Sequence, residues 1–258
     1  MQKTILITGC SSGIGLAAAK DLHSHGYHVI AACRQPADVA QMNSLGLTGL
    51  QLDLDDAASV DRAADEVLAL TQHRLDALFN NAGFAIYGPL HTLTRQQLEQ
   101  QFSTNLFAVH QLTLRLLPAL KASGDGRIIN TSSVLGLISM PGRGAYAASK
   151  FALEAWSDAL RMELHTQGIR VSLIEPGPIS SRFTENVRQG DSANPVLNPA
   201  SADRFTLPPE AILPKLHHAL ESKNPRLRYA VTLVAQIMTV LKRLLPGWIL
   251  DRILRGRA

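Results

Sequence analysis

The chain has 258 residues, of which 46% are hydrophobic and 18% are charged, which is typical of a globular protein large enough to bury a sizeable core. Its net charge of +4 lies wholly in residues 242–258, where five basic side chains stand against one acidic side chain, and the rest of the chain is balanced. A nucleic-acid-binding protein would more often carry a basic face through the body of its fold, so the sequence argues against that class.

The first predicted strand, residues 3–8, runs into a loop that contains Gly9, Gly13 and Gly15 and then into a helical pattern. Glycines between a strand and a helix allow a tight turn and a close approach of the backbone, and the N-terminus of the helix favours a pyrophosphate group. Without the flanking strand and helix, a plain glycine-rich turn would be the simpler interpretation. The arrangement therefore predicts a dinucleotide-binding loop.

The second predicted strand, residues 27–33, is buried and ends at Arg34. In a dinucleotide-binding fold, an acidic residue at this strand end binds the ribose hydroxyls of NAD, whereas an arginine accommodates the 2′-phosphate of NADP. No carboxylate occurs between Asp21 and Asp38, so Arg34 favours NADP. The alternative is an ordinary exposed arginine in a loop.

The middle of the chain continues the alternation of strands and helices. A helix predicted over residues 95–120 contains Asn105, a residue of poor helix propensity whose ordinary role would be a local hydrogen bond or a cap. The motif Asn80-Asn81-Ala82-Gly83 directly follows a predicted strand. The strands predicted in this part are residues 49–53, 75–79 and 127–131, and a further amphipathic helix is predicted over residues 56–71.

Tyr146 and Lys150 lie four residues apart in a run of small residues, which predicts a helix to about residue 166 with both side chains on one face. A phenol has a reference pKa of about 10, and a cation one turn away lowers it toward the pH at which proton transfer to a carbonyl oxygen is useful. Ser133, before this helix, offers a hydroxyl to the same oxygen. Taken alone, such a pair is more often solvated helix surface.

The last third of the chain adds a strand over residues 169–174, a helix over residues 209–222 and a final strand over residues 226–232. The whole rhythm predicts an α/β protein with a single doubly wound (Rossmann) parallel sheet flanked by helices. We expect one domain over residues 1–258, with a lid at about 180–225 and a C-terminal helical extension at about 233–258.

The tail has two interpretations. The apolar run 229–241 is too short for a membrane-spanning helix of about 20 residues. Residues 246–258 combine apolar and basic side chains in the manner of an interfacial helix, which would allow weak contact with an anionic membrane surface. The alternative is a helix packed over the substrate pocket or against a second subunit, with its arginines merely solvated.

Cysteine and histidine usage bears on compartment and metals. Cys10 and Cys33 give no disulfide framework, and the N-terminus enters a strand pattern without the features of a signal peptide, so we expect a cytoplasmic protein. The nine histidines form no His-x-x-x-His pair, and we predict no metal site from them.

The motifs follow one another in a definite order: Thr8-Gly-x-x-x-Gly13-x-Gly15, Asn80-Asn81-Ala82-Gly83, Asn105, Ser133, Tyr146-x-x-x-Lys150 and Pro176-Gly177. Over residues 1 to about 232 the chain resembles the short-chain dehydrogenase/reductase family in this order of motifs. Its first motif and extended C-terminus are similar to the branch of retinol dehydrogenases, 17β-hydroxysteroid dehydrogenases and bacterial NADP-dependent aldehyde reductases. The resemblance implies an NADP(H)-dependent oxidoreductase that interconverts aldehydes or ketones and alcohols, assembled as a homodimer or homotetramer.

The resemblance also implies roles for individual residues. Tyr146 would be the general acid and base, and Ser133 would bind the substrate oxygen. Lys150 would hold the nicotinamide ribose and lower the pKa of the tyrosine, and Asn105 would support a water in the proton relay. The residues that would bind the cofactor are Gly9, Ser11, Gly13, Ile14, Gly15, Arg34, Asp53, Asn81, Ala82, Tyr146, Lys150, Pro176, Gly177, Ile179 and Ser181. Many NADP-dependent members carry a basic residue where this chain has Ser12, so use of NAD as well stays open.

The substrate pocket is expected to have apolar walls, which suits a lipophilic aldehyde, ketone, retinoid or sterol without choosing among them. The walls are predicted from Phe84, Ile86, Tyr87, residues 134–140, Phe183 and Phe205. Two other functions compete with the enzyme: a catalytically silent NADP sensor that retains the fold, and a membrane-surface scaffold acting through the tail. The presence of both Tyr146 and Lys150 favours the enzyme.

Overall fold

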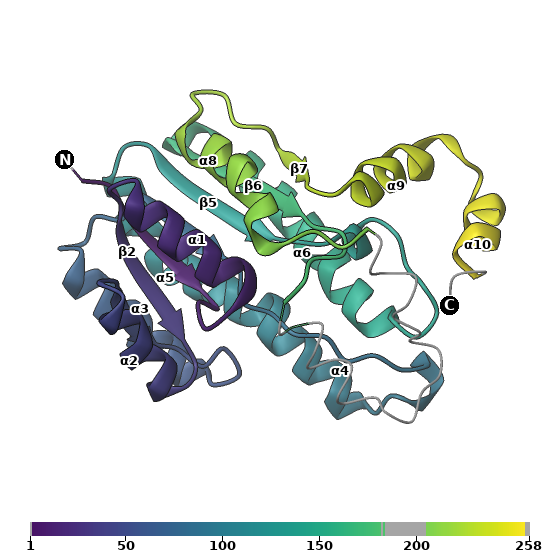
Figure 1. The fold of residues 1–258 in the computed structure, drawn as a ribbon, viewed down its shortest axis with the longest axis horizontal. Helices are drawn as coiled ribbons and strands as arrows, with labels where there is room; N and C mark the ends of the chain where they lie inside the picture. The colour runs from purple at the N-terminus through teal and green to yellow at the C-terminus, as the bar shows by residue number, and fades with distance from the viewer. Residues whose placement is uncertain (1, 182, 184–204, 256–258) are drawn as a thin grey trace.

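A computed structural model describes residues 2–181, 183 and 205–255, and it contains a parallel sheet with helices on both faces (Figure 1). The seven strands have the order β3-β2-β1-β4-β5-β6-β7, and each neighbouring pair is parallel. Strands β2 and β3 follow on one side of β1, and strands β4 to β7 follow on its other side. Doubly wound sheets bind their ligands where the strand order changes direction, which here is between β1 and β4. The predicted doubly wound sheet is confirmed.

The elements agree with most of the predicted ranges. The strands are β1 (Thr4–Thr8), β2 (His28–Cys33), β3 (Thr48–Gln51), β4 (Ala77–Asn80), β5 (Gly126–Thr131), β6 (Ile169–Glu175) and β7 (Arg228–Ala230). The helices are α1 (Gly13–Ser24), α2 (Pro36–Ser44), α3 (Ala57–Leu70), α4 (Arg95–Phe102), α5 (Ala108–Ala122), α6 (Gly144–Glu163), α8 (Leu213–Glu221), α9 (Leu233–Leu244) and α10 (Gly247–Arg255). Short helical turns are η1 (Leu90–Thr92), η2 (Ser103–Phe107), η3 (Val134–Gly136), η4 (His165–Gln167) and η7 (Pro209–Ile212).

Alternation along the strands builds two cores. Successive side chains of a strand point to opposite faces of the sheet, so Ile5 and Ile7 of β1 enter one core and Leu6 enters the other. The first core is covered by α1, α2 and α8, and the second by α3, α5 and α6. All three β1 side chains are fully buried. Both helical layers therefore pack against the faces of the sheet, and a site can form at the strand ends.

Helix α8 belongs to the first of these cores. Leu216, Ala219 and Leu220 are buried among residues of α1 and the sheet, as is Ile212 of the preceding turn. Residues 209–221 are therefore part of the folded core, which corrects the lid expected at about 180–225. The central part of that expected lid, residues 184–204, lies outside the described residues.

Two local features differ from the sequence prediction. The single helix expected over residues 95–120 is divided into α4 and α5 by the π-helical turn η2. The division follows from polar side chains that leave the helix for distant partners, since Thr104 donates to Asp55 and Asn105 bonds the backbone of Phe84. No element was expected where α2 forms, with Pro36 in its first turn.

A buried ion network joins the last strand to the sheet and to α6. The Arg228 guanidinium lies 2.9 Å from Glu154 and 2.6 Å from Asp158, both on α6. It also lies 3.2 Å from Glu175, which ends β6 and is only 1% exposed. Burial raises the pKa of Glu175 to about 7, and the neighbouring charge of Glu154 adds to the rise, while Arg228 opposes it. One arginine thus neutralises carboxylates from two elements.

Glu175 gives the stability of the fold a specific pH dependence. Because its folded-state pKa lies above the unfolded value of 4.5, the folded protein loses stability as the pH rises from about 4.5 to about 7. We expect Glu175→Gln to remove this loss, because Arg228 keeps two other carboxylates. The free energy of unfolding above pH 7 should then exceed that of the wild type by on the order of 2 kcal/mol.

Chemical denaturation of both proteins across this pH range would test the prediction. The two unfolding free energies should converge below about pH 4.5, where the wild-type carboxyl group is protonated in both states. A difference that stays constant with pH would contradict it.

Candidate active site

The predicted site residues gather where parallel strands end at the carboxyl edge of the sheet. The segment after β5 is bonded to the segment after β6, since the Val134 amide donates to the Pro176 carbonyl over 2.8 Å. The segment after β4 is bonded to β1 and β5, because Asn81 Nδ2 donates to the Thr8 carbonyl and Thr131 Oγ1 donates to Asn81 Oδ1. Residues far apart in the sequence therefore line one edge.

The glycine loop packs too closely on its neighbours to accept side chains. Gly9 and Gly13 have φ angles of +75° and +56°, in the left-handed region that favours glycine. A Cβ atom on Gly13 would lie 2.9 Å from Cβ of Ser181, and one on Gly15 would lie 2.1 Å from the Gly9 carbonyl oxygen. Gly9 meets Ala82 in the same way, at 2.9 Å. The structure thus brings together loop residues predicted from three separate motifs.

Thr8 holds this arrangement and was given no role of its own in the predicted site. Its Oγ1 accepts hydrogen bonds from the backbone amides of Asn81 and Ala82, at 3.0 and 2.9 Å. The threonine hydroxyl therefore fixes the second motif against the first. The position of Thr8 directly before Gly9 could have indicated its role, but Asn81, whose amide it accepts, lies 73 residues away in the sequence.

The other predicted cofactor residues lie around the same edge. Arg34 is exposed directly after β2, and the Asp53 carboxylate accepts the backbone amide of Asp55. Ile179 is buried and bridges Leu207, whereas Ser11 and Ile14 are half-buried at the start of α1. Gly177 packs against the hydroxyl of Thr232, which a Cβ atom would meet at 2.1 Å.

Tyr146 and Ser133 form the centre of the candidate active site. The phenol is buried, and the Ser133 side chain lies near enough to affect its pKa. Burial raises the pKa of Tyr146 well above its ordinary value, and the nearby Tyr87 adds to the rise. The Ser133 hydroxyl and the positive charge of Arg143 act in the opposite direction. A proton on this phenol is therefore held firmly at neutral pH.

Lys150 is held at the end of β5. Its Nζ donates to the Thr131 carbonyl over 2.7 Å and lies 5.7 Å from the centre of the Tyr146 ring. The lowering of the tyrosine pKa by Lys150 stays a prediction. Burial lowers the pKa of Lys150 itself to about 8, against the influence of Glu154. The lysine is thus held rigidly beside the phenol without bonding it.

Asn105 links the catalytic helix to the segment after β4. Its Nδ2 donates to the Phe84 carbonyl and to Ser149 Oγ, both over 3.0 Å, and its Oδ1 accepts the Phe84 amide over 3.2 Å. Gln101, which no motif singles out, repeats the pattern one turn earlier. It is fully buried, donates to the Phe84 carbonyl and accepts the amide of Ile86. The two amide side chains fix the predicted pocket wall over residues 84–86.

An apolar cluster surrounds the phenol, and part of it comes from the C-terminal helices. Leu135 and Ile138 are buried in it with Tyr146, as are Met238 of α9 and Leu254 of α10. Partly buried members include Tyr87, Val134, Met140, Phe183, Val234, Leu241 and Leu250. The predicted wall residues Phe84, Ile86 and Phe205 are not members, and Phe205 is 51% exposed. The tail therefore covers the candidate site, as one of its two interpretations expected.

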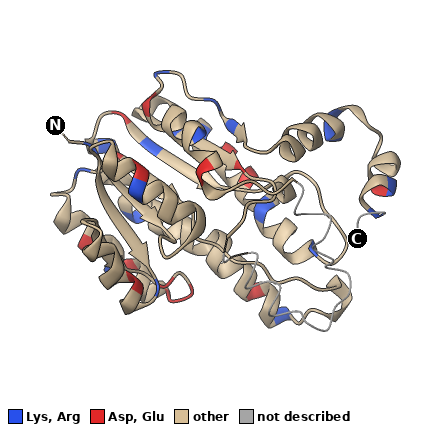
Figure 2. Ribbon diagram, viewed as in Figure 1, with Lys and Arg blue, Asp and Glu red and all other residues tan. Residues whose placement is uncertain are grey.

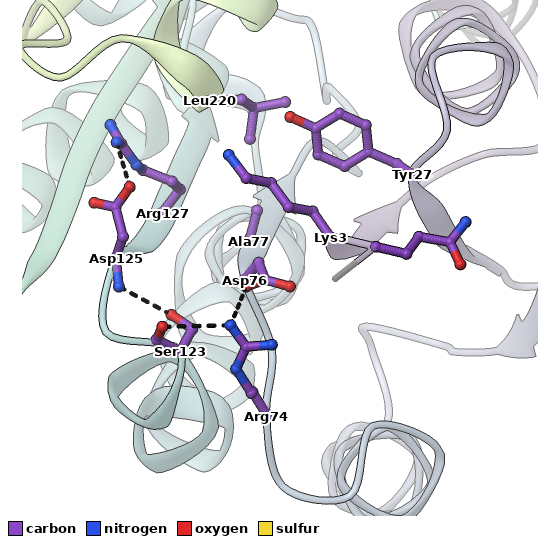
Figure 3. Close-up of a pocket in the computed structure, with 10 residues that line it drawn as sticks. Lys3, Tyr27, Arg74, Asp76, Ala77, Ser123, Asp125, Arg127 and Leu220 are labelled. Atoms are coloured by element: carbon purple, nitrogen blue, oxygen red, sulfur yellow. Dashed lines mark hydrogen bonds and ion pairs between the residues drawn. The ribbon is translucent and has the colours of Figure 1, made fainter.

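A cavity of about 250 Å³ lies at the opposite, amino edge of the sheet (Figure 3). Four of its charged side chains form pairs: Arg74 lies 3.3 Å from Asp76, and Arg127 lies 2.8 Å from Asp125. The Asp76 carboxylate also accepts the Thr4 amide at the start of β1. These pairs close the strand starts, so we assign no chemistry to this cavity.

Several known proteins are similar to this chain over most of its length. The family model described as short chain dehydrogenase matches residues 3–192. The oxidoreductase YbbO of Escherichia coli (strain K12) is 64% identical over 256 residues, which are 99% of this chain and 95% of that protein. The NADPH-dependent 3-dehydrocapnine reductase of Ornithobacterium rhinotracheale is 34% identical, over 96% of this chain and 94% of its own.

Two further similarities extend the comparison. Human retinol dehydrogenase 5 is 35% identical, over 97% of this chain and 87% of that protein. A crystal structure of a putative NAD(P)-dependent gluconate 5-dehydrogenase from Beutenbergia cavernae, with bound NADP at low occupancy, has a TM-score of 0.78 and 27% identity. It covers 89% of this chain and 94% of its own.

The close contact at Gly15 generates a test of the glycine loop. Gly15→Ala would place a methyl group against the Gly9 carbonyl oxygen and 2.8 Å from Asn81 Nδ2, so the loop must shift. We expect the free energy of unfolding to fall by about 1–3 kcal/mol. We also expect dinucleotide affinity to fall by about tenfold or more, measured by fluorescence titration.

Gly247→Ala is the matched control, because a Cβ atom there would meet nothing within 4 Å. It should leave both quantities unchanged. Equal affinities for the two variants would show that the loop does not hold the dinucleotide.

Proposed function

The chain belongs to the short-chain dehydrogenase family and is an NAD(P)-dependent oxidoreductase. From this premise we propose that it uses NADP(H) to reduce a lipophilic aldehyde or ketone to the alcohol, or to catalyse the reverse. The observation that carries the proposal is the buried Tyr146 phenol, near Ser133 and enclosed by an apolar cluster.

The chemistry follows from the positions of the chain's own groups. The bound nicotinamide supplies or accepts the hydride. Tyr146 gives a proton to the carbonyl oxygen in reduction and removes it in oxidation. The Ser133 hydroxyl holds that oxygen beside the phenol and stabilises the charge that develops on it. Lys150 holds the nicotinamide ribose, and Asn105 supports a water in the proton relay.

NADP is supported by residues at the predicted cofactor edge. The glycine loop leads into α1, which begins at Gly13, and a helix N-terminus favours a pyrophosphate. The exposed Arg34 stands where an acidic residue would select NAD. The relative from Ornithobacterium is named NADPH-dependent, and the Beutenbergia structure contains NADP.

A lipophilic substrate is supported by the apolar cluster around Tyr146. One relative is named for retinol and is thus a dehydrogenase of a lipophilic alcohol. The free, buried Cys10 and Cys33 support the expected cytoplasmic location. Exposed apolar side chains of α4, η2 and α5, namely Leu98, Phe107 and Leu114, favour the predicted homo-oligomer.

We also propose that the outer face of α9 and α10 docks on an anionic lipid surface. Among the described residues, no helix combines the length and apolarity that crossing a membrane requires. The inner face of α9 covers the site, while its outer face exposes large apolar side chains at helical spacing. They are Leu233, Ile237, Val240 and Leu244, and Trp248 of α10 continues them. Basic residues occur on both helices (Figure 2).

Tyr146→Phe tests the catalytic assignment. We expect kcat to fall by about 100- to 10,000-fold, because the proton donor is lost, while NADPH affinity is unchanged. Tyr87→Phe is the matched control, since its ring is partly buried in the same cluster and lies 6.1 Å from that of Tyr146. Turnover should be followed as NADPH and NADH oxidation across aldehydes, ketones and steroids.

Near-normal kcat in Tyr146→Phe would reject the mechanism. Tight NADPH binding by the wild type, without turnover of any carbonyl compound, would favour the silent sensor instead.

Arg34→Asp tests the choice of cofactor. A carboxylate at the end of β2 repels the 2′-phosphate and accepts bonds from ribose hydroxyls, so the preference should move from NADPH toward NADH. The ratio of kcat/KM for the two cofactors measures this change, with Arg95→Asp, on the exposed surface of α4, as the control. An unchanged ratio would show that Arg34 does not discriminate.

Vesicle binding tests the docking face. Leu244 and Trp248 are 74% and 69% exposed, and replacing both with Gln should weaken binding to anionic phosphatidylglycerol vesicles by about tenfold or more. Met162→Gln, at a position that is 64% exposed on α6, is the control. Equal binding by all proteins to anionic and neutral vesicles at low salt would contradict the proposal.

A further inference from the structure

Four polar side chains meet between the C-terminal halves of α1 and α8, on the side of the first core. Asp21 and His25 lie one turn apart at the end of α1, and His217 and Glu221 lie one turn apart on α8. The offered ligand atoms of Asp21, His25 and His217 all lie within 4.8 Å of one another. Two pairs of side chains, one from each helix, thus meet at one place away from the candidate active site.

Both histidines are oriented by their Nδ1 atoms. His25 Nδ1 lies 2.8 Å from the Asp21 carbonyl oxygen, and His217 Nδ1 lies 3.0 Å from Glu221 Oε1. Metal-binding histidines usually bond their second ring nitrogen to a carbonyl or carboxylate in this way, which leaves the first nitrogen to bind the metal. His217 Nε2 already faces the Asp21 carboxylate at 2.7 Å.

An ion pair alone accounts for only part of this cluster. Asp21, His217 and Glu221 would form a complete carboxylate–imidazolium–carboxylate bridge without any other group. The His25 ring nevertheless lies against His217, with ring centres 4.8 Å apart in an edge-on arrangement. His25 also lies 3.7 Å from the Asp21 carboxylate through its Nδ1 atom, and as a second imidazole it would supply a third ligand to a metal ion.

We propose that Asp21, His25 and His217 bind a divalent transition metal such as Zn²⁺, with Glu221 positioning His217. Two imidazole nitrogens and one carboxylate oxygen suit Zn²⁺, with water as the fourth ligand, and do not suit Mg²⁺ or Ca²⁺. The negative ends of the α1 and α8 dipoles lie nearby and favour a cation. The ion would fasten the cofactor-loop helix α1 to α8.

Protons compete with the metal at this site. Burial lowers the pKa of His217, but the bonds to Glu221 and Asp21 outweigh it and raise the pKa overall. The groups that face His217 are Asp21 and His25 from α1 and Glu221 from its own helix. Since the proton must leave before Nε2 can bind a metal, apparent affinity should increase as the pH rises.

Metal-dependent stability of the full chain tests the proposal. Saturating Zn²⁺ should raise the Tm of the metal-stripped protein by about 2–5 °C, and Mg²⁺ should not. Co²⁺ should give the visible absorption of a tetrahedral site. Both effects should disappear in His217→Ala and Asp21→Asn, and Glu221→Ala should weaken binding by about tenfold or more.

Two further variants keep the test decisive. The His25 side chain is 57% exposed, so His25→Gln should fold normally and still lose the metal effects. His165→Gln, at an exposed histidine in η4, should keep them. The proposal is overturned if the wild type shows no Zn²⁺ effect, or if His25→Gln and His165→Gln respond to Zn²⁺ equally.

Discussion

The candidate active site depends on one hydrogen bond, from Lys150 Nζ to the Thr131 carbonyl at the end of β5. Burying an ammonium group is costly unless it is bonded, so this contact fixes the helix register against the sheet. The register in turn places Tyr146, one turn earlier on α6, beside Ser133. The Ser149–Asn105 bond secures the same helix from its other side. The chemistry at this edge therefore depends on how α6 is bonded to the end of β5 and to Asn105.

The C-terminal helices α9 and α10 complete the apolar cluster around Tyr146. Met238 and Leu254 close the apolar cluster around the phenol, and Lys242 lies 4.4 Å above the Phe151 ring of α6. Helix α9 is therefore fastened to the catalytic helix by its inner face. Because its outer face remains apolar, the same element that excludes water from the phenol can approach a lipid surface. The buried Leu254 of α10 agrees with a tail packed over the pocket, and membrane contact of the tail stays a prediction.

Local patterns in the sequence predicted the sheet and the motif residues, whereas long-range contacts decided what they missed. Strand ends and glycine loops are signalled within a few residues, which is why Gly13 and Tyr146 could be found. The π-helical turn at Asn105 depends on Phe84 and Asp55, far away in the chain. The burial of α8 and the roles of Gln101 and Arg228 likewise depend on partners from other elements. Hydrophobic periodicity carries no information about such partners.

The environment of Tyr146 also sets the protonation state of its phenol. Burial and the neighbouring Tyr87 raise the pKa of its phenol, and Ser133 and Arg143 only partly oppose this effect. A phenol with a raised pKa is protonated at neutral pH, so it is ready to give a proton to a carbonyl oxygen. Removal of that proton carries the cost of a buried phenolate. The apolar cluster around Tyr146 therefore holds the phenol in its proton-donating form.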